Sequence, residues 1–188
     1  MSAKKVKPVK YTPEPTSSRS TFILGGLAVL VVAALVIGGV LWQADSGKAR
    51  NEGYGGGVQN AAVQVTVEDN GVAVVGVPDA ATTIDLFEDP MCPYCAELEH
   101  KHGQELAQAI DDGRVAVRYH MLAFLDQLSA SGDYSTRAVA AAQCVAATGD
   151  AISYSAFHAA LMSPPDNQRR AGRSDHSNEE LAQMARDA

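Results

Sequence analysis

The longest hydrophobic segment of the chain, FILGGLAVLVVAALVIGGVLW, occupies residues 22–42 and contains no charged residue. As a helix, a segment of this length would be about 31 Å long, which matches the hydrocarbon thickness of a bilayer. Trp42 ends the segment, and an indole ring is favoured at the membrane interface. A buried helix of a soluble domain is a poor alternative, because such helices are rarely apolar on every side. The pattern therefore predicts a membrane-spanning helix over residues 22–42.

A cleaved signal peptide is the stronger alternative to this anchor. A signal peptide has an apolar core of roughly 7–15 residues that is followed by a small-x-small cleavage site. The segment here is longer, and it ends in Trp42-Gln43 rather than in two small residues. We therefore favour an uncleaved, single-pass anchor. Both alternatives export the remainder of the chain.

The segments on either side of the anchor differ in charge and composition. Residues 1–21 are rich in Lys, Pro, Ser and Thr and hold five basic residues against one acidic residue. They are predicted to form a disordered tail, which the positive-inside rule places in the cytoplasm. Residues 43–61 are polar and glycine-rich and are predicted to be a flexible linker. Residues 62–188 would then form one domain outside the cytoplasm.

Within this domain the apolar residues first alternate and then recur with a helical period. VQVTV and VAVVGV flank Asn70-Gly71, which is a hairpin signal. TTIDLFED, over residues 82–89, predicts a strand. A helical period then runs from Pro93 to the stop signal Asp111-Asp112-Gly113. VAVRYHMLAFL, over residues 115–125, predicts another strand, so the pattern indicates a mixed α/β domain.

Three further helices are predicted towards the C-terminus. The first is the alanine-rich segment at 134–148, and the second covers residues 152–162. The third begins at Ser177, which has capping-box spacing to Glu180.

Composition and charge narrow the function classes. The chain is 46% hydrophobic and 20% charged and carries a formal net charge of −7. From residue 43 onward there are 10 Lys and Arg against 21 Asp and Glu, a net charge of −11. An acidic domain argues against nucleic acid as a partner, because phosphate binding requires positive charge.

The segment MCPYC at residues 91–95 is the strongest candidate for chemistry. Cys92 and Cys95 flank two residues at the junction of a predicted strand and a predicted helix. The N-terminus of a helix offers unpaired N–H groups and a partial positive charge, which would stabilise a thiolate on Cys92. Cys95, one turn along, would face inward and attack a mixed disulfide on Cys92. In this context a C-x-x-C predicts a thioredoxin-like redox site, and an exported compartment permits disulfides.

Other uses of the cysteine pair fit the sequence less well. A zinc ribbon requires a second Cys pair, which the chain lacks, and His100 and His102 would lie on different faces of a helix. Covalent haem attachment requires a histidine where the chain has Ala96. A purely structural disulfide stays open, although so short a loop gives the least stabilisation. No metal and no organic cofactor is expected.

The segment DLFEDPMCPYC, followed by a helix, resembles the active-site segment of DsbA-like thiol:disulfide oxidoreductases. TRAVAAAQCVAATGDAISYSAFHAAL is similar to the inserted helices of that family, and the N-terminal anchor resembles that of exported actinobacterial members. The resemblance covers residues 62–188. It implies an α/β, thioredoxin-like fold with a helical insertion at about residues 126–188.

The resemblance also implies roles for the residues of the motif. Cys92 would be the exposed nucleophile and Cys95 its buried partner. Pro93 and Tyr94, between the cysteines, and Asp89, three residues before Cys92, would tune the active site.

Two features depart from the family pattern. Relatives often place a buried acid where this chain has Leu86, and the neighbouring Asp85 should point to the opposite face of the strand. Tuning by a buried carboxylate is therefore not expected from the resemblance. In addition, Pro164 and Pro165 lie in a polar loop with no strand after them, whereas relatives carry a cis-proline loop, two strands and a helix. The chain is accordingly expected to be C-terminally truncated.

Three other side chains receive structural interpretations. Cys144 is predicted to be a small buried residue of an alanine-rich helix, with a disulfide partner in a missing segment as the alternative. His120 and His158 are interpreted as packing or surface residues rather than catalysts.

The sequence thus predicts an extracytoplasmic thiol:disulfide oxidoreductase that introduces disulfides into unfolded exported proteins with free thiols. The resemblance implies reoxidation by a membrane protein of the DsbB or VKOR type. A disulfide reductase or isomerase is the first alternative. A non-catalytic, membrane-tethered binding or chaperone-like module is the second, and the expected truncation favours it.

Overall fold

The computed structural model of the chain describes residues 18–46, 53–163 and 175–188. The chain divides into two compact units, residues 1–47 and 48–188. Most of the predicted cytoplasmic tail, and the prolines Pro164 and Pro165, lie outside the described residues.

The first unit contains one long helix, α1 (Ser18–Ser46). Its segment Arg19–Trp42 has a mean hydropathy of 2.7, and none of it is buried by the rest of the protein. The helix begins before Phe22 and continues past Trp42, so it exceeds the predicted span at both ends. It is long and apolar enough to cross a membrane.

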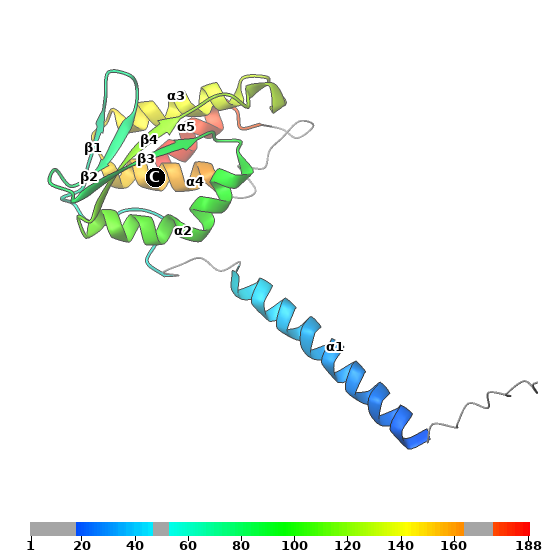
Figure 1. Cartoon of the computed structure of the whole chain (residues 1–188). Coiled ribbons are helices and arrows are strands. Elements are labelled where there is room, and N and C mark those ends of the chain that lie inside the picture. The colour runs from blue at the N-terminus through cyan, green and yellow to red at the C-terminus, as the bar shows by residue number, and fades with distance from the viewer. Residues whose placement is uncertain (1–17, 47–52, 164–174) are drawn as a thin grey trace, which may run out of the picture. The chain divides into compact units, whose positions relative to one another are not determined.

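The second unit is built on a four-stranded sheet with the order β1-β2-β4-β3 (Figure 1). The antiparallel pair β1 (Gln64–Val67) and β2 (Ala73–Gly76) confirms the predicted hairpin. Gly71 in the turn has a φ of 83°, a conformation that suits glycine. On its other side, strand β2 pairs with β4, also antiparallel.

Strands β3 (Thr82–Glu88) and β4 (Val115–Met121) are parallel, and helix α2 (Pro93–Asp111) connects them. The predicted strand, helix and strand are therefore confirmed in order. The prediction that the second strand runs to Leu125 is wrong. Strand β4 ends at Met121 because its partner strand β3 ends at Glu88. The last bond between the two strands runs from the N–H of Leu122 to the carbonyl of Glu88.

After β4 the chain forms a short 3-10 helix, η1 (Asp126–Leu128). Three α-helices follow in the described residues: α3 (Tyr134–Ala146), α4 (Ala151–Met162) and α5 (Asn178–Asp187). The predicted capping box is confirmed, because Ser177 and Glu180 each bond the other's backbone N–H. Helix α2 contacts β4 and β2, and α3 and α4 contact β1.

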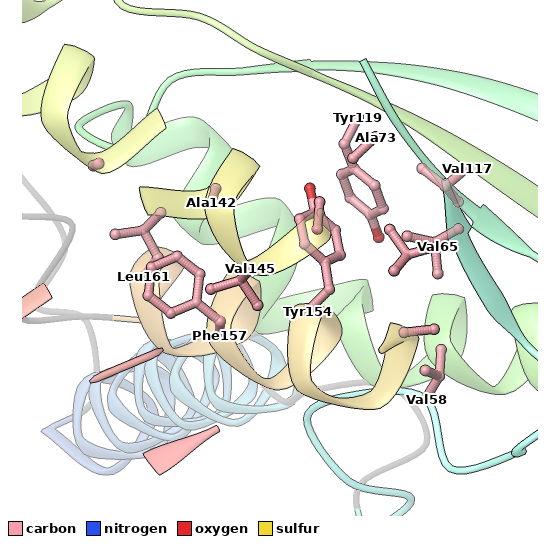
Figure 2. Close-up of a cluster of buried hydrophobic side chains, with 14 of the residues drawn as sticks. Val58, Val65, Ala73, Val117, Tyr119, Ala142, Val145, Tyr154, Phe157 and Leu161 are labelled. Carbon is pink, nitrogen blue, oxygen red and sulfur yellow. The ribbon is translucent and has the colours of Figure 1, made fainter. Parts of the chain in front are cut away.

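The main core lies between the sheet and these helices. Figure 2 shows Tyr154 of α4 beside Tyr119 of β4, with Val117 and Val65 on the sheet side. Phe157 and Leu161, on the same helix, are fully buried. This apolar face is the one that alternation along β4 predicts, since Val117 and Tyr119 are both buried.

The opposite face of the sheet carries a network of polar side chains. Arg118 of β4 pairs with Glu68 at 2.6 Å and with Asp85 of β3 at 3.6 Å. His120 contacts Asp85 at 2.7 Å, and its ring stacks on that of Phe87. Asp85 thus points away from the core, as predicted.

The linker predicted at residues 43–61 differs from the structure at both of its ends. Helix α1 continues to Ser46, and residues 47–52 lie outside the described residues. Residues 53–60 pack on the domain: Val58 is buried in the core, and its N–H donates to Ser155 of α4.

The C-terminal end of α2 binds residues 53–60 through hydrogen bonds. The carboxylate of Asp111 accepts the backbone N–H groups of Gln59 and Asn60 at 2.8 and 3.1 Å. The hydroxyl of Tyr54 also donates to Asp111, and this bond raises the pKa of Tyr54 to about 12. Glycine content alone therefore does not make this segment a free spacer.

Candidate active site

The two cysteines lie at the junction of β3 and α2. Cys92 is the N-cap of α2, with extended backbone, and Pro93 occupies the first turn, where its missing N–H costs nothing. The carbonyl of Cys92 accepts the N–H of Ala96 at 3.1 Å, which closes the first turn of the helix. Cys95 therefore lies one turn from Cys92, and the Cys92 thiol helps to raise the pKa of the Cys95 thiol. This spacing suits the formation of a disulfide between them.

The two cysteines are buried to a similar degree, which differs from the expectation. Cys92 and Cys95 are both half-buried, whereas the family resemblance implied an exposed and a buried thiol. Tyr94, between them, is 79% exposed. Burial raises the pKa of the Cys95 thiol to about 12. A hydrogen bond with the backbone of Asp89 opposes this rise, whereas the Cys92 thiol and the Glu88 carboxylate add to it. Cys95 therefore holds its proton at neutral pH.

Asp89 is completely buried and is satisfied by hydrogen bonds. Its Oδ1 accepts the N–H of Met91 at 2.8 Å and the hydroxyl of Ser135 at 2.7 Å. Its Oδ2 accepts the N–H of Leu125 at 2.9 Å. The side chain thus joins the turn before Cys92 to the loop after β4 and to the start of α3.

A second buried carboxylate, Glu88, lies at the end of β3. Its Oε2 is 2.7 Å from Nε2 of His158, which projects from α4, and both side chains are almost fully buried. The other carboxylate oxygen, Oε1, is buried and has no hydrogen-bond partner among the described residues. Burial lowers the pKa of His158, but the charge and hydrogen bond of Glu88 overcome this effect and raise it to about 9.

Sequence reasoning missed this pair. Glu88 continues the alternation of Ile84 and Leu86 along β3, which places it on the core face. His158 follows Tyr154 by one turn and therefore shares its buried helical face. The two-residue period of the strand and the helical period of α4 are therefore the sequence patterns that could have indicated this pair. The resemblance gave no buried acid at position 86, but the structure places the buried carboxylate of Glu88 where it interacts electrostatically with Cys95.

Glu99 extends the polar cluster along α2. It lies one turn after Cys95, and burial raises its pKa. It interacts electrostatically with His158 and Glu88. The interior next to Cys95 is therefore charged on several elements, although the surrounding core is apolar.

The prediction that Cys144 is buried is wrong, because the residue is exposed. Ala138, Ala142 and Val145 form the buried face of α3. A residue two positions from Ala142 lies about 200° around the helix and faces outward. Small residues occur on all sides of this helix, so its sequence does not show which face packs against the domain.

The histidines next to the motif do not gather into a metal site. His100 is exposed, and Nδ1 of His102 lies 3.2 Å from Glu105 on the same helix. Among residues 18–46, 53–163 and 175–188, no three His, Cys, Asp or Glu side chains are placed to hold a metal ion.

A parallel β-α-β unit with two thiols at the start of its helix is the arrangement of thioredoxin-like thiol–disulfide exchange proteins. Residues 68–187 match the family model described as thioredoxin. The chain therefore belongs to the thioredoxin family. The predicted thioredoxin-like α/β fold is thereby confirmed.

Solved structures similar to the domain are disulfide oxidoreductases. The reduced form of DsbG from Mycobacterium tuberculosis is 31% identical, with a TM-score of 0.56 over 64% of this chain and 62% of that one. Reduced DsbA from the same organism is 32% identical, with a TM-score of 0.51 over 68% and 64% of the two chains. MdbA from Corynebacterium diphtheriae, a thiol-disulfide oxidoreductase, is 29% identical, with a TM-score of 0.58 over 72% and 68%. The resemblance to DsbA-like oxidoreductase enzymes is thus confirmed.

A curated relative belongs to another class of protein. The serine/threonine-protein kinase PknE of Mycobacterium tuberculosis is 42% identical over 124 residues. These residues are 66% of this chain but 22% of the kinase. The chain thus spans about a fifth of the length of PknE and less than two thirds of DsbG.

Proposed function

We propose that the protein is a membrane-anchored thiol:disulfide oxidoreductase that introduces disulfides into exported proteins through Cys92 and Cys95. The observation that carries the proposal is the pair of thiols one turn apart at the N-terminus of α2, in a domain similar to DsbA. A helix N-terminus favours an anionic sulfur at its first position. The chemistry requires neither a metal nor an organic cofactor.

The exchange proceeds in two steps. In the oxidised protein a client thiolate attacks Sγ of Cys92, the Cys92–Cys95 bond breaks, and Cys95 leaves with the electron pair. A second client thiolate then attacks the client sulfur bound to Cys92. The client leaves with a disulfide, and the protein keeps two thiols. Two electrons must then pass to a membrane reoxidase of the DsbB or VKOR type.

The neighbouring residues support this exchange in different ways. Pro93 fixes φ at the first turn of α2, which suits the start of the helix that carries both cysteines. Asp89 anchors the turn that carries Cys92. Tyr94 is exposed beside the thiols and is placed to contact a client.

The oxidising direction is the finer part of the proposal. Disulfides of this fold range from roughly −270 mV in reducing thioredoxin to roughly −120 mV in oxidising DsbA. Equilibration of the protein with glutathione buffers, followed by alkylation and mass measurement, gives the potential. We expect a value near the oxidising end. A value near −270 mV would assign the protein to the reductases instead.

The location of the site outside the cytoplasm is also proposed. It is supported by the apolar helix Arg19–Trp42 and by the basic residues before it. A cytoplasmic tail, an anchor and an exported domain would follow one another along the chain. Intact cells treated with a membrane-impermeant maleimide should be labelled at the exposed Cys144. Labelling only after lysis would place the domain in the cytoplasm.

Oxidation of reduced ribonuclease A by the full chain in detergent tests the activity. We expect recovery of ribonuclease activity with a catalytic amount of protein and an excess of oxidised glutathione. Cys92→Ser should abolish the acceleration, whereas the matched variant Cys144→Ser should retain it. Full acceleration by Cys92→Ser would disprove the assigned nucleophile.

A non-catalytic module is the second candidate function. The match to a segment of PknE favours it, because this type of domain is there one part of a larger protein. The apolar side chains of Ile84 and Phe87 on edge strand β3 are also exposed, and they would suit a binding surface. Suppression of aggregation of an unfolded client by Cys92→Ser, without any oxidation by the wild type, would favour this candidate.

A further inference from the structure

The ion pair between Glu88 and His158 joins strand β3 to helix α4 next to the redox site. Glu88 lies four residues before Cys92 at the end of β3, and His158 comes from α4. Their side-chain atoms are 2.7 Å apart, and the two side chains are only 1% and 3% exposed. Burying a charge is costly unless a partner neutralises it, so each of these groups depends on the other.

The groups that act on His158 come from several elements. Glu88 belongs to β3, Glu99 belongs to α2, and the ring of Tyr119 on β4 lies 4.6 Å away. Cys95, also on α2, interacts electrostatically with Glu88. Tyr154 lies one turn earlier on the same helix. Among these described neighbours, His158 is the group that can carry a positive charge. Glu88, Glu99 and Cys95 all become negative when they lose a proton.

We propose that His158 is a positioning residue of the redox site, whose imidazolium neutralises Glu88 and thereby lowers the free energy of the Cys95 thiolate. This inference rests on the proposed exchange at Cys92 and Cys95. It gives helix α4 a role in the reaction, because the compensating charge comes from this helix rather than from the unit of β3, α2 and β4.

The charge requirement arises in the first step of exchange. When the client sulfur bonds to Cys92 and the Cys92–Cys95 bond breaks, the electron pair stays on Cys95, which then takes a proton from solvent. Until that proton arrives, a second negative charge lies near Glu88. Without His158 the anion of Cys95 would face an uncompensated carboxylate in a medium of low dielectric constant.

The reactivity of Cys95 alone tests the proposal. The parent for this experiment is the full chain with Cys92→Ser and Cys144→Ser, so that Cys95 is its one thiol. Its rate of reaction with the small disulfide DTNB at pH 8 measures the thiolate. His158→Asn should lower this rate about tenfold, the effect of one pKa unit. His158→Asn combined with Glu88→Gln should return it to within threefold of the parent.

The urea midpoint of every variant, measured at pH 8, separates charge compensation from structural damage. An ion pair that only stabilises the fold also recovers stability when both partners are neutralised, so the rates are compared without denaturant, where each variant is folded. His120→Asn is the matched control, because His120 forms the same type of contact with Asp85, also 2.7 Å long, on the opposite face of the sheet. It should leave the rate unchanged. An unchanged rate in His158→Asn, or no rescue in the double variant, would overturn the proposal.

A measurement on the parent needs no substitution at position 158. Below about pH 8 the logarithm of the rate should rise with unit slope, as the thiolate fraction grows. Between pH 8 and 10 the slope should fall clearly below one, because His158 then loses the proton that compensates Glu88. A unit slope through pH 10 would overturn the proposal. Failure to oxidise ribonuclease would instead count against the proposed function, since this rate involves no client.

Discussion

The carboxylate of Asp89 accepts the backbone N–H of Leu125 at 2.9 Å, across 36 positions of sequence. Through this bond and those to Met91 and Ser135, one fully buried side chain fixes the turn before Cys92 against the loop after β4. Asp89 therefore acts in this structure as an anchor for the motif.

Replacement of this anchor should weaken the whole domain. Asp89→Ala would leave two backbone N–H groups and one hydroxyl without their acceptor, and each loss costs about 1–3 kcal/mol. We expect the free energy of unfolding in urea to fall by at least about 3 kcal/mol. Asp126→Ala removes bonds to Thr136 at a more exposed position and should cost clearly less. Equal losses in the two variants would contradict the anchoring role.

The buried pair of Glu88 and His158 should make stability depend on pH. The pKa of His158 is raised to about 9 from an ordinary value of 6.5, so the folded state holds a proton that the unfolded state has lost between these values. The stabilisation is fully present below pH 6.5 and disappears as pH rises through about 9. The difference in urea midpoint between wild type and His158→Asn should shrink over this window. A difference that is constant from pH 6 to pH 9.5 would contradict the pairing.

A close approach between two strands makes Gly76 intolerant of a side chain. A Cβ at this position would lie 2.6 Å from Cβ and 2.9 Å from Cα of Ala116 on the paired strand β4. Gly76→Ala should therefore destabilise the domain by about 1–3 kcal/mol in thermal or urea unfolding. Gly56→Ala is the control, because its nearest neighbour would be Cβ of Ala159 at an ordinary 3.7 Å. If Gly76→Ala lost no stability, strand β4 would have to move away from the added methyl group at little cost, which would contradict this prediction.

The exposure of Cys144 predicts how the protein is alkylated. The oxidised protein, with Cys92 and Cys95 joined, should take up one maleimide under native conditions, and the reduced protein should take up more. Cys144→Ser should remove the adduct of the oxidised form and change the free energy of unfolding by no more than about 0.5 kcal/mol. Mass spectrometry of the intact chain distinguishes these species. An oxidised protein that is labelled only after denaturation would show that Cys144 is buried.

Much of the fold was predictable because its signals are local. The uncharged run 22–42 indicates a membrane-length helix, and alternation on either side of Asn70-Gly71 indicates a hairpin. Ser177 and Glu180 mark a helix start through their spacing alone. The position of CPYC between a strand and a helix also follows from local pattern, and it carried the family resemblance.

Contacts between distant segments were not predictable in this way. The sequence determined the periodicity of each element and the chemistry of Cys92 and Cys95, because both reside in a few neighbouring residues. Only the tertiary structure decided that Glu88 meets His158 and that Asp89 meets Ser135, since each pair comes from elements brought together by packing. It also decided that Cys144 faces solvent, because the side on which an alanine-rich helix packs depends on its neighbours rather than on its own sequence.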